Sequence, residues 1–250
     1  MYGDAPLYGL PWLVDVRMLY YWRKDLPSLE KELRNSRDAR DSFRRSLQSA
    51  GDAGHPLFAL PTARDWELLH QTALLVWGNG GELIEIRRWW PGYRFRTATL
   101  NEPALRGAEY LRSLATDRLI ALPRETRQQL EEKFVAHQLG SVISGPWLMS
   151  QLEQQGAMSD GSIGITLPPL YGRDPVTFVG GSLLGVTARN PALRASAIEL
   201  ARHLSMGPGS LPTALAAGLL PALSEARGTA SGAVRRMAAL QSGESMLDIL

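Results

Sequence analysis

Apolar and polar positions along this chain follow two periods, and the two periods predict a mixture of strands and helices. Residues 12–21 are rich in aromatic, β-branched and aliphatic side chains, which is typical of one long strand. Apolar residues spaced three or four positions apart predict amphipathic helices elsewhere. We expect helices at 23–50 with a break near 35–36, 62–77, 101–119, 125–139, 191–204, 208–219 and 221–240. We expect shorter strands at 57–60, 141–144, 162–166 and 177–187.

A hairpin is predicted over residues 82–100, because side-chain polarity alternates on both sides of Pro91-Gly92. Trp89 and Trp90 come directly before this turn. Aromatic residues at a loop tip can bind ligands, but we expect these two to pack over the edge of the hairpin.

A strand-to-helix junction is predicted at residues 141–152, which read Ser-Val-Ile-Ser-Gly-Pro-Trp-Leu-Met-Ser-Gln-Leu. Proline suits the first position of a helix, so the strand should end at Ser144 or Gly145 and the helix should begin at Pro146. Backbone N–H groups, the positive end of a helix dipole and the indole of Trp147 would then coincide. These residues alone favour Trp147 as core filling, with a ligand contact as the alternative.

Two polar features interrupt apolar strands. Asp15 and Arg17 are two positions apart, so they should share one face of their strand. Either they pair locally or lie on an exposed face, or they project together into a cleft. Gly180 and Gly181 lie inside the strand expected at 177–187, where glycines indicate a bulge or the close approach of a segment or ligand.

The composition is that of an ordinary globular protein, with 44% hydrophobic and 21% charged residues among 250. This length suits one large domain or two lobes. A net charge of +2 gives no electrostatic case for nucleic acid as a partner. The chain has no cysteine, which excludes disulfides and thiolate metal sites, and no apolar run approaches the roughly 18 residues of a membrane span. The first residues carry neither the basic nor the apolar region of an export signal.

Catalytic chemistry finds little support in the sequence. The histidines, at positions 55, 70, 137 and 203, are scattered, with no pair at metal-ligand spacing. The serine before Gly145-Pro146 lacks the preceding glycine of a nucleophile elbow. The glycine cluster at 78–81 follows a helix and is therefore not a phosphate loop. We predict no catalytic residue, no metal and no cofactor.

Four landmarks nevertheless occur in a recognisable order. They are Tyr-Gly-Leu-Pro-Trp-Leu-Val-Asp-Val-Arg-Met-Leu-Tyr-Tyr-Trp-Arg-Lys-Asp at 8–25, the helix into Trp-Gly-Asn-Gly-Gly at 77–81, Phe134 through Ser-Gly-Pro-Trp at 144–147, and Leu-Pro at 167–168 with Phe-Val-Gly-Gly-Ser at 178–182 and Gly-Leu-Leu-Pro at 218–221. With these landmarks the chain resembles the extracellular solute-binding proteins of ABC importers, in the sugar-binding family that includes maltose-binding protein.

The resemblance implies an α/β fold like that of type II periplasmic binding proteins, with two hinged lobes and ligand held between them. Residues 1–17 would be a first-lobe remnant and crossing strand, 18–179 the second lobe and 180–250 the returning first-lobe segment. The resemblance also implies that Trp147 stacks on a sugar ring and that Asp15 accepts hydrogen bonds from sugar hydroxyls. Further candidate ligand contacts are Trp12, Arg17, His70, Gly145, Gly180, Gly181 and Ser182.

Family members begin with a signal peptide and several strand–helix units, whereas this chain starts at what looks like the first crossing. We therefore expect an incomplete first lobe. The first functional hypothesis is non-catalytic capture of a mono- or oligosaccharide for the membrane subunits of an ABC importer, outside the cytoplasm, with a lipid anchor in the full-length protein. The alternative is a ligand-sensing or interaction domain of a larger cytoplasmic regulator.

Overall fold

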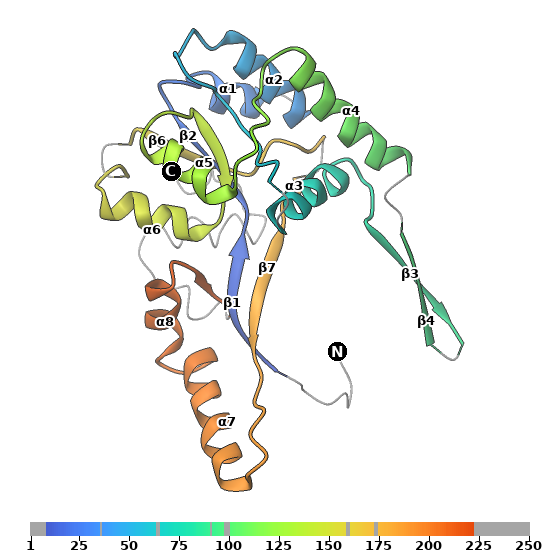
Figure 1. Ribbon diagram of the computed structural model, residues 1–250, viewed down its shortest axis with the longest axis vertical. Helices are drawn as coiled ribbons and strands as arrows, with labels where there is room; N and C mark the ends of the chain where they lie inside the picture. Colours follow the sequence, from blue (N-terminus) through green and yellow to red (C-terminus); the bar gives the residue numbers. More distant parts are fainter. Residues whose placement is uncertain are drawn as a thin grey trace. The chain divides into compact units, whose positions relative to one another are not determined.

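The computed structural model describes residues 9–35, 37–63, 66–90, 92–97, 101–158, 161–172 and 175–222, except for the side chain of Trp66. The chain divides into two compact units. Unit 1 comprises Met1–Val16, Gly145–Gln151 and Val179–Leu250, and unit 2 comprises Arg17–Ser144 and Leu152–Phe178. Figure 1 shows the elements of each. The helix predicted at 221–240 lies almost wholly outside the described residues.

Unit 1 is built on a three-stranded antiparallel sheet in the order β7 (Val179–Leu184), β1 (Leu10–Val16), β8 (Leu220–Pro221). Asp15 of the central strand pairs with Gly180, and Val14 with Gly181. A Cβ atom at Gly181 would lie 2.7 Å from the carbonyl oxygen of Leu13, so only glycine permits this spacing of the two strands. The glycines predicted to mark a close approach thus meet the backbone of β1.

Two of the helices in unit 1 lie next to its sheet. Helix α7 (Pro191–Ser205) is capped by Asn190, whose side chain accepts from the N–H of Ala192 at 3.0 Å. Its last residue, Ser205, donates a hydrogen bond to the carbonyl of Pro11, which fastens the helix to the start of β1. Helix α8 (Ser210–Ala216) leads into β8. Strand β8 places Leu220 and Pro221 beside Val14 and Leu13 of β1.

Unit 2 carries most of the buried core. Its antiparallel sheet has the order β5 (Ser141–Ser144), β2 (Met18–Trp22), β6 (Ile163–Thr166), and β2 is buried on both faces. The helices of the unit are α1 (Leu29–Asn35), α2 (Ala39–Ser49), α3 (Trp66–Trp77), α4 (Glu102–Thr116) and α5 (Arg127–Val135). The core cluster comprises Leu19, Tyr21, Leu26, Leu29, Phe43, Leu47, Phe58, Leu60, Leu74, Leu75, Ile143 and Leu170.

The predicted junction at residues 141–152 is confirmed. Strand β5 ends at Ser144 and helix α6 (Pro146–Gln154) begins at Pro146. Gly145 lies between them, and the carbonyl of Gly145 accepts the N–H of Leu148. The proline ring and the missing proline N–H therefore act as the local sequence predicts.

Two predictions about strands need correction. The long strand expected at 12–21 is two strands, because β1 and β2 belong to different sheets and the break falls at Arg17. There the N–H of Arg17 donates to the carbonyl of Phe178 at 3.0 Å, and the Thr177 hydroxyl donates to the Arg17 carbonyl. The strand expected at 57–60 is only an isolated bridge between Ala59 and Ala121.

The hairpin is confirmed as β3 (Ile84–Trp89) and β4 (Gly92–Thr97), but the expected packing of its tryptophans is wrong. Trp90 is 89% exposed and Trp89 is 55% exposed. The Arg94 guanidinium lies over the Trp89 ring at 3.9 Å, which provides a cation–π contact in place of apolar packing. Among the described strands, none pairs with either edge of this two-stranded ribbon.

Candidate functional site

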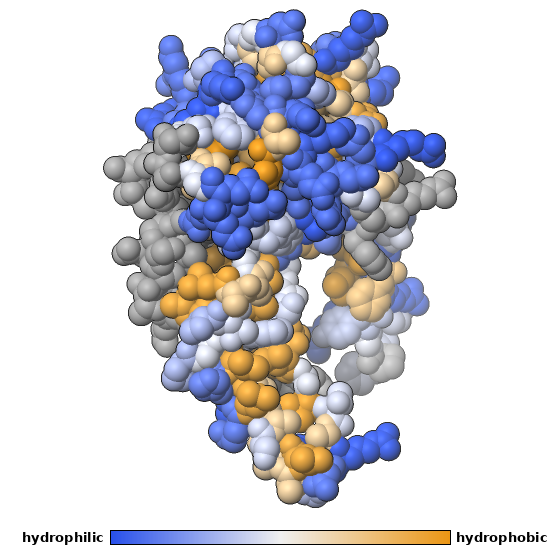
Figure 2. All heavy atoms as spheres, turned by 60° about the vertical axis from the view of Figure 1, so that its left-hand side comes forward, coloured by the Kyte–Doolittle hydropathy of each residue, from blue (hydrophilic) through white to orange (hydrophobic). Residues whose placement is uncertain are grey.

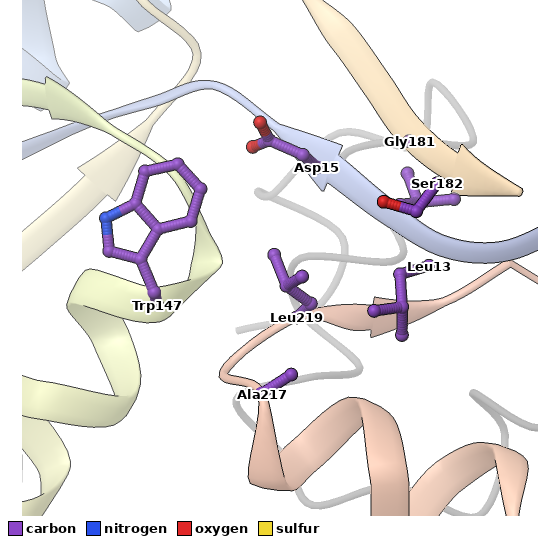
Figure 3. Close-up of a pocket in the computed structure, with 8 residues that line it drawn as sticks. Leu13, Asp15, Trp147, Gly181, Ser182, Ala217 and Leu219 are labelled. Carbon is purple, nitrogen blue, oxygen red and sulfur yellow. The ribbon is translucent and has the colours of Figure 1, made fainter.

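A pocket of about 410 Å³ lies within unit 1, and its walls come from all three chain segments of that unit. Strand β1 gives one wall, β7 another, the start of α6 a third, and the turn between α8 and β8 the last. Figure 3 shows the pocket. The residues that line it are Leu13, Val14, Asp15, Trp147, Gly181, Ser182, Ala217 and Leu219.

Trp147 is held in the first turn of α6 by two glycines. A Cβ atom at Gly145 would overlap the six-membered ring of the indole, so glycine leaves the space that this ring occupies. Gly218 has a φ of 65°, and a Cβ there would lie 3.0 Å from the Cα of Trp147. The indole is half-buried and reaches the pocket. Trp147 is therefore a fixed aromatic surface at a helix N-terminus and is not enclosed in a core.

Asp15 reaches the same pocket from the central strand of the sheet. Its partner across the ladder is Gly180, which has no side chain to cover the carboxylate. In Figure 3 the carboxylate points toward the side of the pocket where the indole of Trp147 stands. Asp15 as a whole residue is half-buried and lines the pocket, so part of its surface is available to a ligand.

The lining has the composition of a site for a polar ligand with an apolar face. Leu13, Leu219 and the indole give apolar surface, whereas the Asp15 carboxylate accepts hydrogen bonds and the Ser182 hydroxyl donates or accepts them. The volume lies within the roughly 300–1,000 Å³ typical of small-molecule pockets. Among these lining residues there is no histidine or lysine that could serve as a base for a nucleophile.

The structure brings four of the predicted contact residues together, namely Asp15, Trp147, Gly181 and Ser182. Gly145 and Gly180 are not among the residues that line the pocket. Gly145 leaves space for the ring of Trp147, and Gly180 pairs with Asp15 in the sheet. Trp12 is on the same strand but does not line the pocket. Its indole Nε1 is buried without a hydrogen-bond partner among the described residues.

Arg17 and His70 belong to unit 2 and form part of a separate polar network. The Arg17 guanidinium, 3% exposed, donates to Glu67 at 3.0 Å and lies 3.2 Å from Nδ1 of His70. Glu67 also accepts from Arg127 at 3.2 Å, and Arg127 pairs with Glu131. The His70 ring lies 4.3 Å from that of Phe178. Arg17 thus pairs with Glu67, 50 positions away in the chain, and the roles of Arg17 and His70 toward a ligand stay predictions.

Sequence reasoning did not identify Leu13, Val14, Ala217 and Leu219 as lining residues. The sequence identifies residues 218–221 only as one of the family landmarks, and no local pattern predicts that this turn lies against β1. The only sequence signal for this position is the Leu-Pro pair at 220–221 that forms β8. Two residues do not predict a strand by themselves, and the strand is defined only by its pairing with Leu13 and Val14.

The sequence matches no family model and no curated protein, whereas its fold matches many solved structures. One is the maltose-bound protein MalE3 of T. maritima, with a TM-score of 0.69 and 19% identity over 94% of this chain and 61% of that one. A solute-binding protein of an ABC transporter from Thermotoga lettingae, bound to α-D-tagatose, gives 0.67 and 17% over 97% and 59%. The cyclic α-maltosyl-1,6-maltose binding protein of Arthrobacter globiformis gives 0.66 and 19% over 96% and 58%.

These matches confirm the predicted fold class: the chain has the α/β fold of the sugar-binding proteins of ABC transporters, the type II periplasmic-binding class. At this level of identity the likeness establishes the fold alone. The chain spans about three fifths of the length of these proteins. Among the described residues, no helix is both long enough and apolar enough to cross a membrane.

Proposed function

We propose that this chain binds a small polar solute, a mono- or oligosaccharide, and presents it to the membrane subunits of an ABC importer outside the cytoplasm, without catalysing a reaction. The observation that carries the proposal is that an indole and a carboxylate, those of Trp147 and Asp15, line the same pocket of unit 1.

The chemistry of a sugar explains why these two groups suit each other. A pyranose ring has apolar C–H faces and a belt of hydroxyl groups. An aromatic ring covers a face, and a carboxylate accepts hydrogen bonds from neighbouring hydroxyls. In this pocket the leucines extend the apolar surface, and the Ser182 hydroxyl adds a second polar contact. A ligand that carries a carboxylate or a phosphate group would instead be repelled by the negative charge of Asp15.

The structural neighbours support the same ligand class. The three described above were solved as binding proteins for maltose, α-D-tagatose and cyclic α-maltosyl-1,6-maltose. All of these are carbohydrates. Transport through an ABC importer and a place outside the cytoplasm follow for this chain by the same analogy.

Calorimetric titration with a panel of these sugars and other oligosaccharides tests the proposal. Trp147→Ala should weaken binding of the cognate sugar by about 1–3 kcal/mol, because the stacking surface is lost. Trp90→Ala is the matched control, since that indole is almost fully exposed on the hairpin of unit 2. It should leave the affinity unchanged.

A second variant tests the polar contact of Asp15 separately from the aromatic contact of Trp147. Asp15→Asn keeps the shape but removes the charge, so it should weaken sugar binding by about 1–3 kcal/mol, the size of a hydrogen bond to a charged group. Binding that survives both Trp147→Ala and Asp15→Asn undiminished would contradict this site. Failure of the chain to bind any sugar of the panel would contradict the proposed function.

A further inference from the structure

Three side chains that the proposed function does not use meet at one end of the unit 2 sheet. Asp25 follows β2, His55 lies in the loop between α2 and α3, and His137 follows α5. Nε2 of His137 lies 2.9 Å from Oδ2 of Asp25, and Nε2 of His55 lies 3.5 Å from the same oxygen. One ligand-type atom from each of the three residues lies within 4.8 Å of the other two.

Gly140 ties the three segments together. Its N–H donates to the carbonyl of Pro56, next to His55, at 2.9 Å, and its carbonyl accepts from the N–H of Trp22 at the end of β2. A Cβ atom at Gly140 would lie 3.0 Å from the carbonyl oxygen of Leu57, so glycine permits the close approach of the loop that carries His55. The cluster is therefore positioned by backbone hydrogen bonds that do not involve its own side chains.

The histidine rings are further restricted by their surroundings. The ring of His137 stacks on Trp22 with centroids 4.2 Å apart, and its backbone adopts a left-handed φ of 54°. The three side chains are largely covered, with 7% of Asp25, 16% of His55 and 23% of His137 exposed. Nδ1 of His55 is buried and has no hydrogen-bond partner among the described residues.

We propose that Asp25, His55 and His137 form a binding site for a divalent transition-metal ion of the zinc class, which clamps the loop of His55 to the ends of β2 and α5. Two imidazoles and one carboxylate are a donor set that zinc accepts, with water at a fourth position. Ligand atoms around a tetrahedral zinc ion are roughly 3.3–3.6 Å apart, given bond lengths of about 2.0–2.2 Å. The separation of 3.5 Å lies within this range, and the separation of 2.9 Å would have to widen by about half an ångström when the ion binds.

The donor set also excludes other classes of ion. Calcium and magnesium require mostly oxygen ligands, and here two of three ligands are nitrogen. Of the three residues, His55 also lines a cavity of about 320 Å³ in unit 2, together with Asp52 and Arg118. The site is composed of unit 2 residues only, so it stands independently of the sugar pocket in unit 1.

Titration of the untagged, EDTA-treated chain with zinc chloride in a calorimeter tests the proposal. We expect one ion per chain, and a loss of affinity of about tenfold or more in His55→Gln and in His137→Ala, because each removes a direct ligand. His203→Ala is the matched control, since His203 lies in α7 of unit 1, and it should bind zinc like the wild type. Zinc should also raise the melting temperature of the wild type more than that of His55→Gln.

Cobalt provides a second readout, because its visible absorption reports the coordination of the bound ion directly. The wild-type chain loaded with Co²⁺ should show the intense visible absorption of a four-coordinate site, and His55→Gln, a loop substitution, should lose it. Absence of zinc binding by the folded wild type would show that the cluster is a hydrogen-bonded group only and would overturn the proposal. Zinc affinity that is unchanged in both His55→Gln and His137→Ala would do the same.

Discussion

The Asp38 side chain caps helix α2 and also forms an ion pair with Arg40. Its carboxylate caps α2 by accepting the N–H of Arg40 at 3.0 Å. The same carboxylate receives the Arg40 guanidinium at 2.7 Å. The hydrogen bond from the Arg40 side chain lowers the pKa of Asp38 below its usual value, and burial opposes this effect only in part. Both interactions favour the charged carboxylate in the folded state.

Substitution of Asp38 should therefore change stability in a pH-dependent way. Asp38→Ala should lower the free energy of unfolding by about 1 kcal/mol at pH 7, the usual loss for an N-cap. Asp38→Asn keeps an acceptor but loses the charge. Because the folded-state pKa lies below the unfolded value of about 3.9, the charge contributes fully above that pH and is lost as the pH falls through the folded-state pKa. Urea unfolding of the three proteins between pH 7 and pH 3 measures this.

The expected pattern is a gap between wild type and Asp38→Asn that closes toward acid. A gap of constant size over that range would show that the Arg40 pair does not stabilise the charged form of Asp38.

Helices α3 and α4 pack closely because Gly107 lies at their crossing. A Cβ atom at Gly107 would overlap the carbonyl oxygen of Leu75 in α3. The side-chain amide of Asn79 donates to the same carbonyl at 2.7 Å, so that oxygen cannot easily move away. Here the position in a helix favours alanine, but the neighbouring helix requires glycine.

Gly107→Ala tests which effect is larger. In an exposed helix interior this change stabilises by about 1 kcal/mol. At this crossing we expect the opposite, a loss of about 1–3 kcal/mol in the free energy of unfolding, because the helices must separate. Glu109→Ala, on the exposed side of α4, is the control and should change stability by less than about 0.5 kcal/mol. Chemical denaturation compares the two, and a stabilised Gly107→Ala would mean that the helices adjust freely.

The two units differ in how much apolar surface they bury. The core cluster named above belongs wholly to unit 2. In unit 1 several large apolar side chains remain exposed, and Figure 2 shows such side chains gathered over the part of the unit that contains α7 and α8. The exposed large apolar side chains of unit 1 include Val179, Leu183, Leu193, Ile198, Leu200, Met206 and Leu215. Burial supplies most of the driving force for folding, so the described part of unit 1 should open more easily.

Hydrogen exchange followed by mass spectrometry measures this difference along the chain. Amides of α7 should exchange roughly tenfold faster or more, relative to their intrinsic rates, than amides of β2 and β5. The comparison is made in the absence of ligand. Equal protection in α7 and β2 would show that the chain unfolds as one cooperative unit.

The sequence by itself determined the elements whose signals are local. Asn101 and Asn190 cap α4 and α7, Pro146 begins α6, and the alternation around Pro91-Gly92 forms the hairpin. These features depend on backbone angles and hydrogen bonds within a few residues, so short-range chemistry suffices. The resemblance of its landmarks to a known family supplied the fold class as well.

Only the tertiary structure decided which distant residues meet. It divided the strand at Arg17, because β1 and β2 join different sheets. It placed Trp147 and Asp15 around one pocket and brought His55 and His137 to one carboxylate, although nothing in their spacing indicates either meeting. Such contacts depend on strand pairing and packing between residues that are far apart in the sequence. Their free energy is a property of the whole fold, which no local pattern encodes.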